Sequence, residues 1–348
     1  MSIQNQATST TFSTLDKAWG SVLSESQNGD GYYSVRVFGS SDYSVFVGQH
    51  QPSGLIDVAF EVSPKSIKKI HLAQEAKGFE VKVQKTEGSA NIKIRRVCVT
   101  LNRHSFSDLF KVLAVDIVEH CLKASSEVEA MMLLHSRLEH WRRFSEKAGE
   151  GGLTVQEQTG LFGELLFLQT LLEKGVDSTD SLKAWHGPLR ENQDFCFGTL
   201  AVEVKASVSN TPNLVTISNI RQLDSTGLDK LYLYHVSLDR REGSGKTLPS
   251  VIDELLDSFK SKSESEVLFQ ELLMLQGYHH SQSNLYQGAG YTEREHNFYV
   301  VLQGFPRILE RDLVDGVSGV RYKIDLSCAS PFKKELKQTI LAIKQNMS

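Results

Sequence analysis

The sequence is short of cysteine, proline and net charge, and each shortage excludes a class of protein. Its 348 residues include four cysteines and seven prolines. The cysteines lie far apart and lack paired zinc-finger spacing, so the sequence predicts neither a disulfide framework nor a zinc site. Lysine and arginine number 38 against 42 acids, a net charge of −4. This balance excludes a surface coated with positive charge for unselective nucleic-acid binding, so any such binding has to be local.

Long apolar runs are also lacking. No run approaches the roughly 20 residues that cross a bilayer, and the opening stretch, MSIQNQATSTTFS, is polar and has no secretory apolar region. We therefore expect a globular protein that works in the cytoplasm, with no membrane partner. Hydrophobic residues make up 40% of the chain, which is enough to bury the cores of two domains or of one large domain.

Alternating strands, helices and glycines divide the sequence into two parts. The stretches YYSVRVF and YSVFV alternate like strands, and helices are predicted over residues 105–122 and 126–144. The glycine-rich stretch EKAGEGGL, residues 146–153, then predicts a linker. We expect a β-rich module with two helices over residues 1–150 and a second domain over residues 151–348.

Positive charge gathers in one segment of the first part. Between Glu61 and His104 the chain has ten lysines and arginines and four acids. The alternating runs FEVKV and NIKIRRVCVTL predict a β-hairpin whose polar face presents Lys82, Lys93 and Arg95. Two interpretations stay open: an ordinary solvated strand surface, or a surface that docks nucleic acid through its phosphates.

The stretch QDFCFGTLAVEVKAS, residues 193–207, places charged residues inside two apolar runs. A two-residue turn that begins at its glycine predicts a hairpin in which Asp194 lies opposite Glu203. Because side chains alternate along a strand, Asp194, Glu203 and Lys205 then share one face and the large hydrophobic residues share the other. Opposed carboxylates destabilise a sheet unless a cation lies between them.

A divalent metal could supply that cation, since hard ions such as Mg²⁺ are bound by carboxylate, carbonyl and water oxygens. The alternative is an exposed hairpin in which Lys205 neutralises its neighbours. The residues by themselves leave both interpretations open.

A helix is predicted before the hairpin, over TGLFGELLFLQTLLEKG, with Gly175 in the left-handed position at its end. Its apolar stripe consists of Leu161, Leu165, Leu168 and Leu172. At ~100° per residue, Glu164 lies on the border of that stripe and is expected to be half-buried. Gly160 and Gly163 would let a strand approach the helix closely.

The order of these parts carries a resemblance. A helix with Glu164 is followed by a hairpin with Asp194 and Glu203-Val204-Lys205, then by SNIRQLD and the strand KLYLYHVSL. This order resembles the PD-(D/E)XK nuclease superfamily. GLFGEL, followed by D-x8-E-V-K and RQL, is similar to the bacterial PD-(D/E)XK motif protein family, which is associated with defence and restriction genes. The resemblance is strongest over residues 155–240, and the WRRF and YKIDLS segments extend it over most of the chain.

One departure from the superfamily pattern is Gln193, where proline commonly precedes the aspartate. The fold implied is α+β or mixed α/β, with the N-terminal β-rich module followed by a restriction-endonuclease-like αβββαβ core. Two further helices, in SVIDELLDSF and ESEVLFQELLMLQG, and two strands, in NFYVVLQ and VRYKIDLS, are expected to complete the second domain.

The resemblance also implies roles for single residues. Asp194 and Glu203 would hold Mg²⁺, or Mn²⁺ in its place, together with the backbone carbonyl of Val204. Lys205 would orient or help to deprotonate the attacking water. Glu164 would lie near the metal, as a second-sphere ligand or as a ligand of a second ion.

From a crossover helix, Gln222 would contact the phosphate or Lys205, with Ser218 or Asn219 capping that helix. The activity implied is that of a Mg²⁺-dependent DNA endonuclease in a bacterial restriction or phage-defence system. The alternative is a non-catalytic subunit that keeps the nuclease fold to bind DNA or to scaffold other proteins. Such systems supply further candidate partners, a helicase or ATPase and a methyltransferase, and an oligomer is compatible with the sequence.

Overall fold

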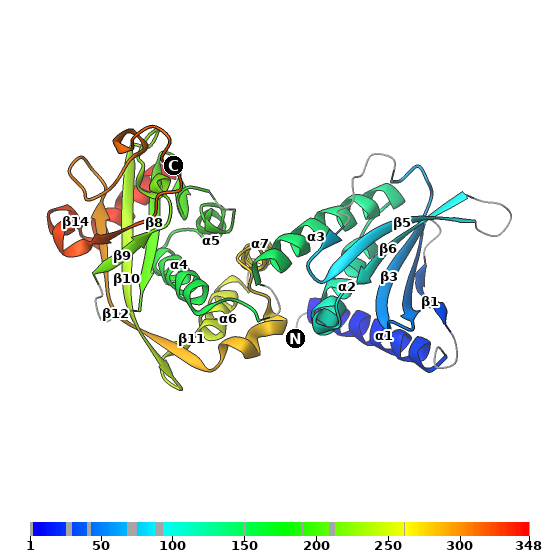
Figure 1. Cartoon of the computed structure of the whole chain (residues 1–348). Helices are drawn as coiled ribbons and strands as arrows, with labels where there is room; N and C mark the ends of the chain where they lie inside the picture. Colours follow the sequence, from blue (N-terminus) through cyan, green and yellow to red (C-terminus); the bar gives the residue numbers. More distant parts are fainter. Residues whose placement is uncertain are drawn as a thin grey trace. The chain divides into compact units, whose positions relative to one another are not determined.

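The computed structural model (Figure 1) describes residues 3–25, 30–39, 43–67, 75–87, 93–148, 151–189, 191–208, 213–260 and 262–347. The chain divides into two compact units, Met1–Glu150 and Gly151–Ser348. Both units contain helices and strands, so the mixed α+β fold predicted from the sequence is confirmed. Within the described residues, no helix is long and apolar enough to cross a membrane.

Unit 1 is built on a six-stranded sheet with the order β1-β2-β3-β6-β5-β4. Every neighbouring pair in it is antiparallel. Its strands are β1 (Gly31–Gly39), β2 (Ser44–Gln51), β3 (Leu55–Val62), β4 (Glu75–Ala76), β5 (Phe79–Glu87) and β6 (Lys93–Leu101). The hairpin predicted from FEVKV and NIKIRRVCVTL is therefore present as β5 and β6, while its turn lies outside the described residues.

The register of this hairpin corrects one prediction. Lys82 pairs with Cys98, whereas Lys85 pairs with Arg95 and Glu87 with Lys93. Because opposed residues share a face and faces alternate, Lys82 lies on the face opposite to that of Lys93 and Arg95. The prediction that Lys82, Lys93 and Arg95 form one surface is wrong, and the basic residues that share a face are Lys85, Lys93 and Arg95.

The described residues of unit 1 also form three α-helices, α1 (Ile3–Glu25), α2 (Ser107–Leu122) and α3 (Glu127–Ala148), with a short 3₁₀ turn, η3 (His104–Phe106), before α2. The second and third were predicted. Helix α1 was not, because its sequence is mostly polar. Leu15, Trp19 and Val22 supply its buried stripe, and the Trp19 indole N–H donates to the carbonyl of Asp57 at 3.0 Å.

Helices α2 and α3 are joined by a charged cluster. The Asp116 carboxylate of α2 accepts hydrogen bonds from Arg137 Nε at 2.9 Å and from Trp141 Nε1 at 2.8 Å, both on α3. Burial by itself would raise the pKa of Asp116, but the hydrogen bonds and charges of His120 and Arg137 outweigh it and hold that pKa well below the usual range.

Unit 2 contains a mixed sheet with the order β11-β12-β10-β8-β7, and β14 also pairs with β12. Strands β8 and β10 are parallel, whereas β7 with β8 and β10 with β12 are antiparallel. The strands of this sheet are β7 (Phe195–Phe197), β8 (Leu200–Ser207), β10 (Lys230–Glu242), β11 (Lys246–Thr247), β12 (Ala289–Val300) and β14 (Lys333–Lys334). A separate ladder joins β9 (Leu214–Ile217) to β13 (Tyr322–Asp325).

The helices of unit 2 are α4 (Val155–Glu173), α5 (Ser178–Lys183), α6 (Leu248–Phe259), α7 (Ser263–Leu275) and α8 (Leu336–Asn346). Short 3₁₀ turns are η4 (Gly187–Leu189), η5 (Ile220–Leu223), η6 (His280–Tyr286), η7 (Glu310–Asp312) and η8 (Leu326–Phe332). The expected crossover helix is only the four-residue turn η5. The predicted cap is present there, since Asn219 accepts from the Arg221 N–H at 3.0 Å.

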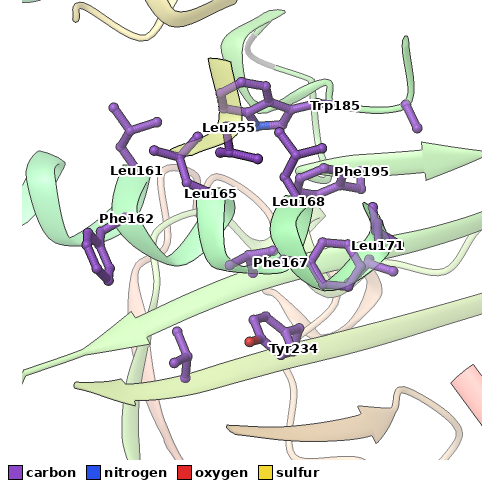
Figure 2. Close-up of a cluster of buried hydrophobic side chains, with 14 of the residues drawn as sticks. Leu161, Phe162, Leu165, Phe167, Leu168, Leu171, Trp185, Phe195, Tyr234 and Leu255 are labelled. Carbon is purple, nitrogen blue, oxygen red and sulfur yellow. The ribbon is translucent and has the colours of Figure 1, made fainter. Parts of the chain in front are cut away.

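Helix α4 packs on two sides. Figure 2 shows Leu161, Leu165 and Leu168 directed toward Leu255 of α6 and toward Trp185. On its other side, the Phe167 ring lies 5.1 Å from the Tyr234 ring of β10. The predicted leucine stripe therefore packs against α6 and Trp185, and the sheet meets a different side of the helix. Gly175 ends α4 with a positive φ of 74°, as expected.

The two helix glycines differ in what they permit. A Cβ atom at Gly163 would lie 2.7 Å from the Cβ of Ala206 on β8, so this glycine lets helix and strand approach. A Cβ atom at Gly160 would meet nothing within 4 Å, so the prediction that Gly160 also serves a close approach is wrong.

Candidate active site

The hairpin of β7 and β8 has the predicted register. Phe195 pairs with Val202 and Phe197 with Leu200. The side chains of these four residues belong to the large core that includes α4, whereas Ala201 belongs to a second core on the opposite face of the sheet. By the period-two alternation of β8, Glu203 and Lys205 lie on the face of Ala201.

Asp194 lies immediately before β7, and its side chain contacts the backbone of β8. Its Oδ2 accepts a hydrogen bond from the N–H of Val204 at 2.8 Å. Because the N–H and C=O of one strand residue point to the same side, the carbonyl of Val204 is also directed toward the side of Asp194. The backbone carbonyl of Asp194 accepts from the N–H groups of His186 and Gly187, at 2.8 and 3.0 Å. The aspartate is thereby fixed from two directions.

Glu203 and Lys205 form a buried pair. Glu203 is 0% exposed, and its Oε1 lies 2.5 Å from Lys205 Nζ. Its second oxygen, Oε2, is buried and has no hydrogen-bond partner among the described residues. Burying a carboxylate oxygen without a hydrogen-bond partner destabilises the protein unless another group, such as a cation, contacts that oxygen.

The charges of the site influence one another. Burial, followed by the nearby charge of Asp194, raises the pKa of Glu203 well above its usual range. Burial tends to lower the pKa of Lys205, but Glu203 and Asp194 outweigh it and leave that pKa raised. The raised pKa of Lys205 and the effect of Asp194 on Glu203 are those of a site with surplus negative charge, which a divalent cation would offset.

Glu164 reaches the site from α4 and is half-buried, as predicted. Its Oε2 accepts two hydrogen bonds, from Trp185 Nε1 at 2.7 Å and from Gln276 Nε2 at 2.8 Å. A Cβ atom at Gly187 would lie 2.5 Å from Glu164 Oε2 and 3.3 Å from Asp194 Oδ1. Gly187 therefore separates the two carboxylates, and any side chain at this position would displace that of Glu164.

Three of these positions were missed from the sequence: Trp185, Gly187 and Gln276. The partners of Glu164 lie 21 and 112 residues away along the chain, and no local pattern connects positions that are so distant. The glycine-proline pair at 187 and 188 signals a turn, which is the only hint that the sequence offered.

Gln222 lies on the η5 turn. Its Oε1 accepts from the N–H of Ser218 at 2.9 Å, so the side chain closes the η5 turn. Among the described residues, no hydrogen bond joins it to Lys205. Gln193, at the position where proline was expected, donates through Nε2 to the carbonyl of Arg221 at 2.8 Å. It ties the hairpin to the η5 turn, which a proline could not do.

His235 is a further neighbour that the sequence did not single out. It lies opposite Lys205 in the parallel pairing of β8 with β10 and is 1% exposed. Its Nε2 lies 2.9 Å from the hydroxyl of Ser207, and burial lowers its pKa to about 4. A neutral imidazole thus stands beside the lysine.

The donor set fits a hard divalent metal. Asp194, Glu203 and the Val204 carbonyl supply oxygen ligands, which Mg²⁺ and Mn²⁺ prefer. The observation that supports this fit is the buried Oε2 of Glu203, which has no hydrogen-bond partner among the described residues.

A helix bearing a glutamate, packed on a mixed sheet whose hairpin carries Asp and then Glu-x-Lys, defines the PD-(D/E)XK class of protein. Residues 15–327 match the model of one family in this class, described as "Putative PD-(D/E)XK family member, (DUF4420)", and the chain belongs to that family. No curated protein and no solved structure matches the chain.

Proposed function

We propose that the chain is a metal-dependent DNA endonuclease of a bacterial restriction or phage-defence system. The observation that carries the proposal is the meeting of Asp194, Glu203 and Lys205 at one edge of the sheet, with Glu164 beside Asp194. Membership of a PD-(D/E)XK family supports it. A subunit without catalysis would have little physical reason to bury a carboxylate oxygen that has no hydrogen-bond partner.

Each residue of the site has a part in this chemistry. Asp194, Glu203 and the carbonyl of Val204 would hold Mg²⁺ or Mn²⁺. The bound metal would lower the pKa of a water molecule and stabilise negative charge on the phosphate. Lys205 would orient that water or accept its proton, and would offset phosphate charge. Trp185 and Gln276 would keep Glu164 directed toward the site.

DNA would dock on unit 1 through the basic residues that share one face of the β5–β6 hairpin, Lys85, Lys93 and Arg95. Lys82, on the other face, lies 2.6 Å from Glu80, and this acid offsets its charge. Counterion release from the phosphates would supply the binding free energy.

A cleavage assay on supercoiled plasmid, with Mg²⁺ or Mn²⁺, tests the activity. The wild-type chain should produce nicked and linear DNA. Lys205→Met should bind Mn²⁺ with unchanged affinity and cleave at least about 100-fold more slowly, the usual effect of losing one electrostatic contact in a transition state. Asp257→Asn, at an exposed aspartate of α6 that pairs with Lys260, is the matched control and should cleave at the wild-type rate.

DNA binding without cleavage, by wild-type protein with either metal, would instead support the non-catalytic subunit. Because DNA in a bacterial cell lies in the cytoplasm, an enzyme that cuts it there would be a cytoplasmic protein. A helicase, ATPase or methyltransferase of the same system is the kind of partner we expect, and adding such a partner to the assay tests whether the chain cuts alone. Sedimentation with and without DNA tests for an oligomer.

A further inference from the structure

A second group of side chains of the types that bind metals lies beside the site just described. His186, Glu191 and Cys196 each offer one ligand atom, and these atoms lie within 4.8 Å of one another. The His186 Nδ1 atom is 2.7 Å from Glu191 Oε2. None of these residues has a part in the chemistry proposed for Asp194, Glu203 and Lys205.

The backbone keeps these residues together. Trp185 forms an antiparallel bridge with Phe195, the N–H of Cys196 donates to the carbonyl of Ala184 at 2.8 Å, and the N–H of His186 donates to that of Asp194 at 2.8 Å. This short ladder places His186 and Cys196 as diagonal neighbours on one face. Only Glu191 reaches the group from outside the ladder.

The ligand types differ from those of the carboxylate site. An imidazole, a carboxylate and a thiolate together favour a borderline-soft ion such as Zn²⁺ over Mg²⁺. Three protein ligands leave the fourth tetrahedral position for water. The ion pair of His186 and Glu191 accounts for two of the three groups. Cys196 packs against the second core of unit 2, and this packing holds its sulfur within 4.8 Å of the other two ligand atoms.

We propose that His186, Glu191 and Cys196 form a site for a divalent transition metal of the zinc class, separate from the carboxylate site. Binding would open the contact between Nδ1 and Oε2 to about 3.4 Å, the spacing of two ligands in a tetrahedral zinc site. The metal would brace the segment that carries Trp185 and Gly187, the residues that position Glu164. The spacing of the cysteines did not predict this site, because its ligands include only one cysteine.

Cobalt titration of the full-length chain tests the proposal, since tetrahedral Co²⁺ bound to a thiolate absorbs strongly through charge transfer from sulfur. The wild-type protein should take up one Co²⁺ per chain with this absorbance, and Zn²⁺ should displace it. Cys196→Ser should abolish the absorbance. Cys328→Ser, at an exposed cysteine, is the matched control and should retain it.

Two further variants separate folding from binding and one site from the other. Glu191 is 52% exposed, so Glu191→Gln should leave the melting temperature unchanged without metal and weaken Zn²⁺ binding at least about tenfold, since even outer-shell partners are worth that much. Asp194→Asn should keep the cobalt absorbance. The proposal is overturned if the wild-type chain gives no sulfur charge-transfer band, if Cys196→Ser keeps it, or if Asp194→Asn loses it. None of these outcomes depends on nuclease activity.

Discussion

At the scale of single residues, the proposed site depends on residues that take no direct part in the chemistry. Gly187 separates Glu164 from Asp194, while Trp185 and Gln276 hold Glu164 by its Oε2 atom. A catalytic group displaced by about 1 Å can cost 10²-fold in rate. The supporting residues should therefore be nearly as sensitive to mutation as the carboxylates.

Gly187→Ala tests this dependence. The new methyl group would overlap the Glu164 carboxylate, so we expect Glu164 to move and cleavage to slow about 100-fold, with a melting temperature close to that of the wild type. Gly160→Ala is the matched control, because its Cβ atom would meet nothing within 4 Å. As an alanine inside a helix, it should stabilise the protein by about 0.5–1 kcal/mol. Equal cleavage rates in the two variants would show that the separation is unimportant.

At the scale of secondary-structure elements, charged contacts decide how neighbouring elements are joined. Asp116 connects α2 to α3 through Arg137 and Trp141. Removing one partner of such a mostly buried pair leaves the other without compensation and destabilises a protein by about 3 kcal/mol.

Asp116→Asn should therefore destabilise unit 1 by about 3 kcal/mol at pH 7. The folded pKa of Asp116 lies below its unfolded value, so its contribution is present above pH ~4 and is lost as the pH falls through the folded pKa. The difference between wild type and variant should shrink in acid. Urea unfolding followed by tryptophan fluorescence measures this difference in unfolding free energy. The experiment uses a Trp185→Phe background, so that Trp19 and Trp141 of unit 1 are the reporters.

The control for this charge is Asp108→Asn, an exposed acid in the first turn of α2, which should cost less than about 1 kcal/mol. A destabilisation by Asp116→Asn that stays constant between pH 7 and pH 3 would show that the charge of Asp116 is not what stabilises the helix pair.

The β5–β6 hairpin supplies a matched test of DNA docking. Lys85→Ala and Lys82→Ala each remove one charge from the same strand, but from opposite faces of the sheet. If DNA lies on the face of Lys85, its loss should reduce the slope of log affinity against log salt by about 0.9, and the loss of Lys82 should leave the slope unchanged. Fluorescence anisotropy across a salt series measures both slopes. If the slope of each variant equals that of the wild type, the hairpin is not part of the DNA interface.

The sequence predicted those elements whose geometry is local. The β7–β8 register was correct because a two-residue turn fixes the pairing, and the end of α4 was correct because Gly175 can adopt a positive φ. The prediction that Lys82 and Lys93 share a face was wrong because the connection between β5 and β6 is longer than a two-residue turn and does not fix the register of the two strands. The expectation for Gly160 was also wrong, because a glycine inside a helix does not by itself show which side of that helix a strand approaches.

At the scale of the whole molecule, the chain consists of two units, and the proposed chemistry belongs to one of them. Glu164, Asp194, Glu203 and Lys205 all lie in unit 2, which has two hydrophobic cores of its own. The basic hairpin lies in unit 1. Affinity for metal and affinity for DNA should therefore be separable.

Residues 151–348 expressed alone should fold and bind Mn²⁺ as tightly as the full-length chain. They should bind DNA more weakly and with a shallower salt dependence, because the hairpin is missing. Calorimetry and anisotropy measure the two affinities. A fragment that folds but has lost Mn²⁺ binding would mean that unit 1 contributes to the metal site.

The alternation along β8 has a consequence for the gene. Odd-numbered residues Ala201, Glu203 and Lys205 lie on the face of the site, and even-numbered residues Val202 and Val204 fill the core with α4. A codon inserted or deleted within the strand would move every later side chain to the opposite face, burying charge in the core and leaving apolar groups at the site. Two codons together would restore the alternation. Among alleles with length changes in this strand, those that gain or lose one codon should therefore lose activity more often than those that gain or lose two.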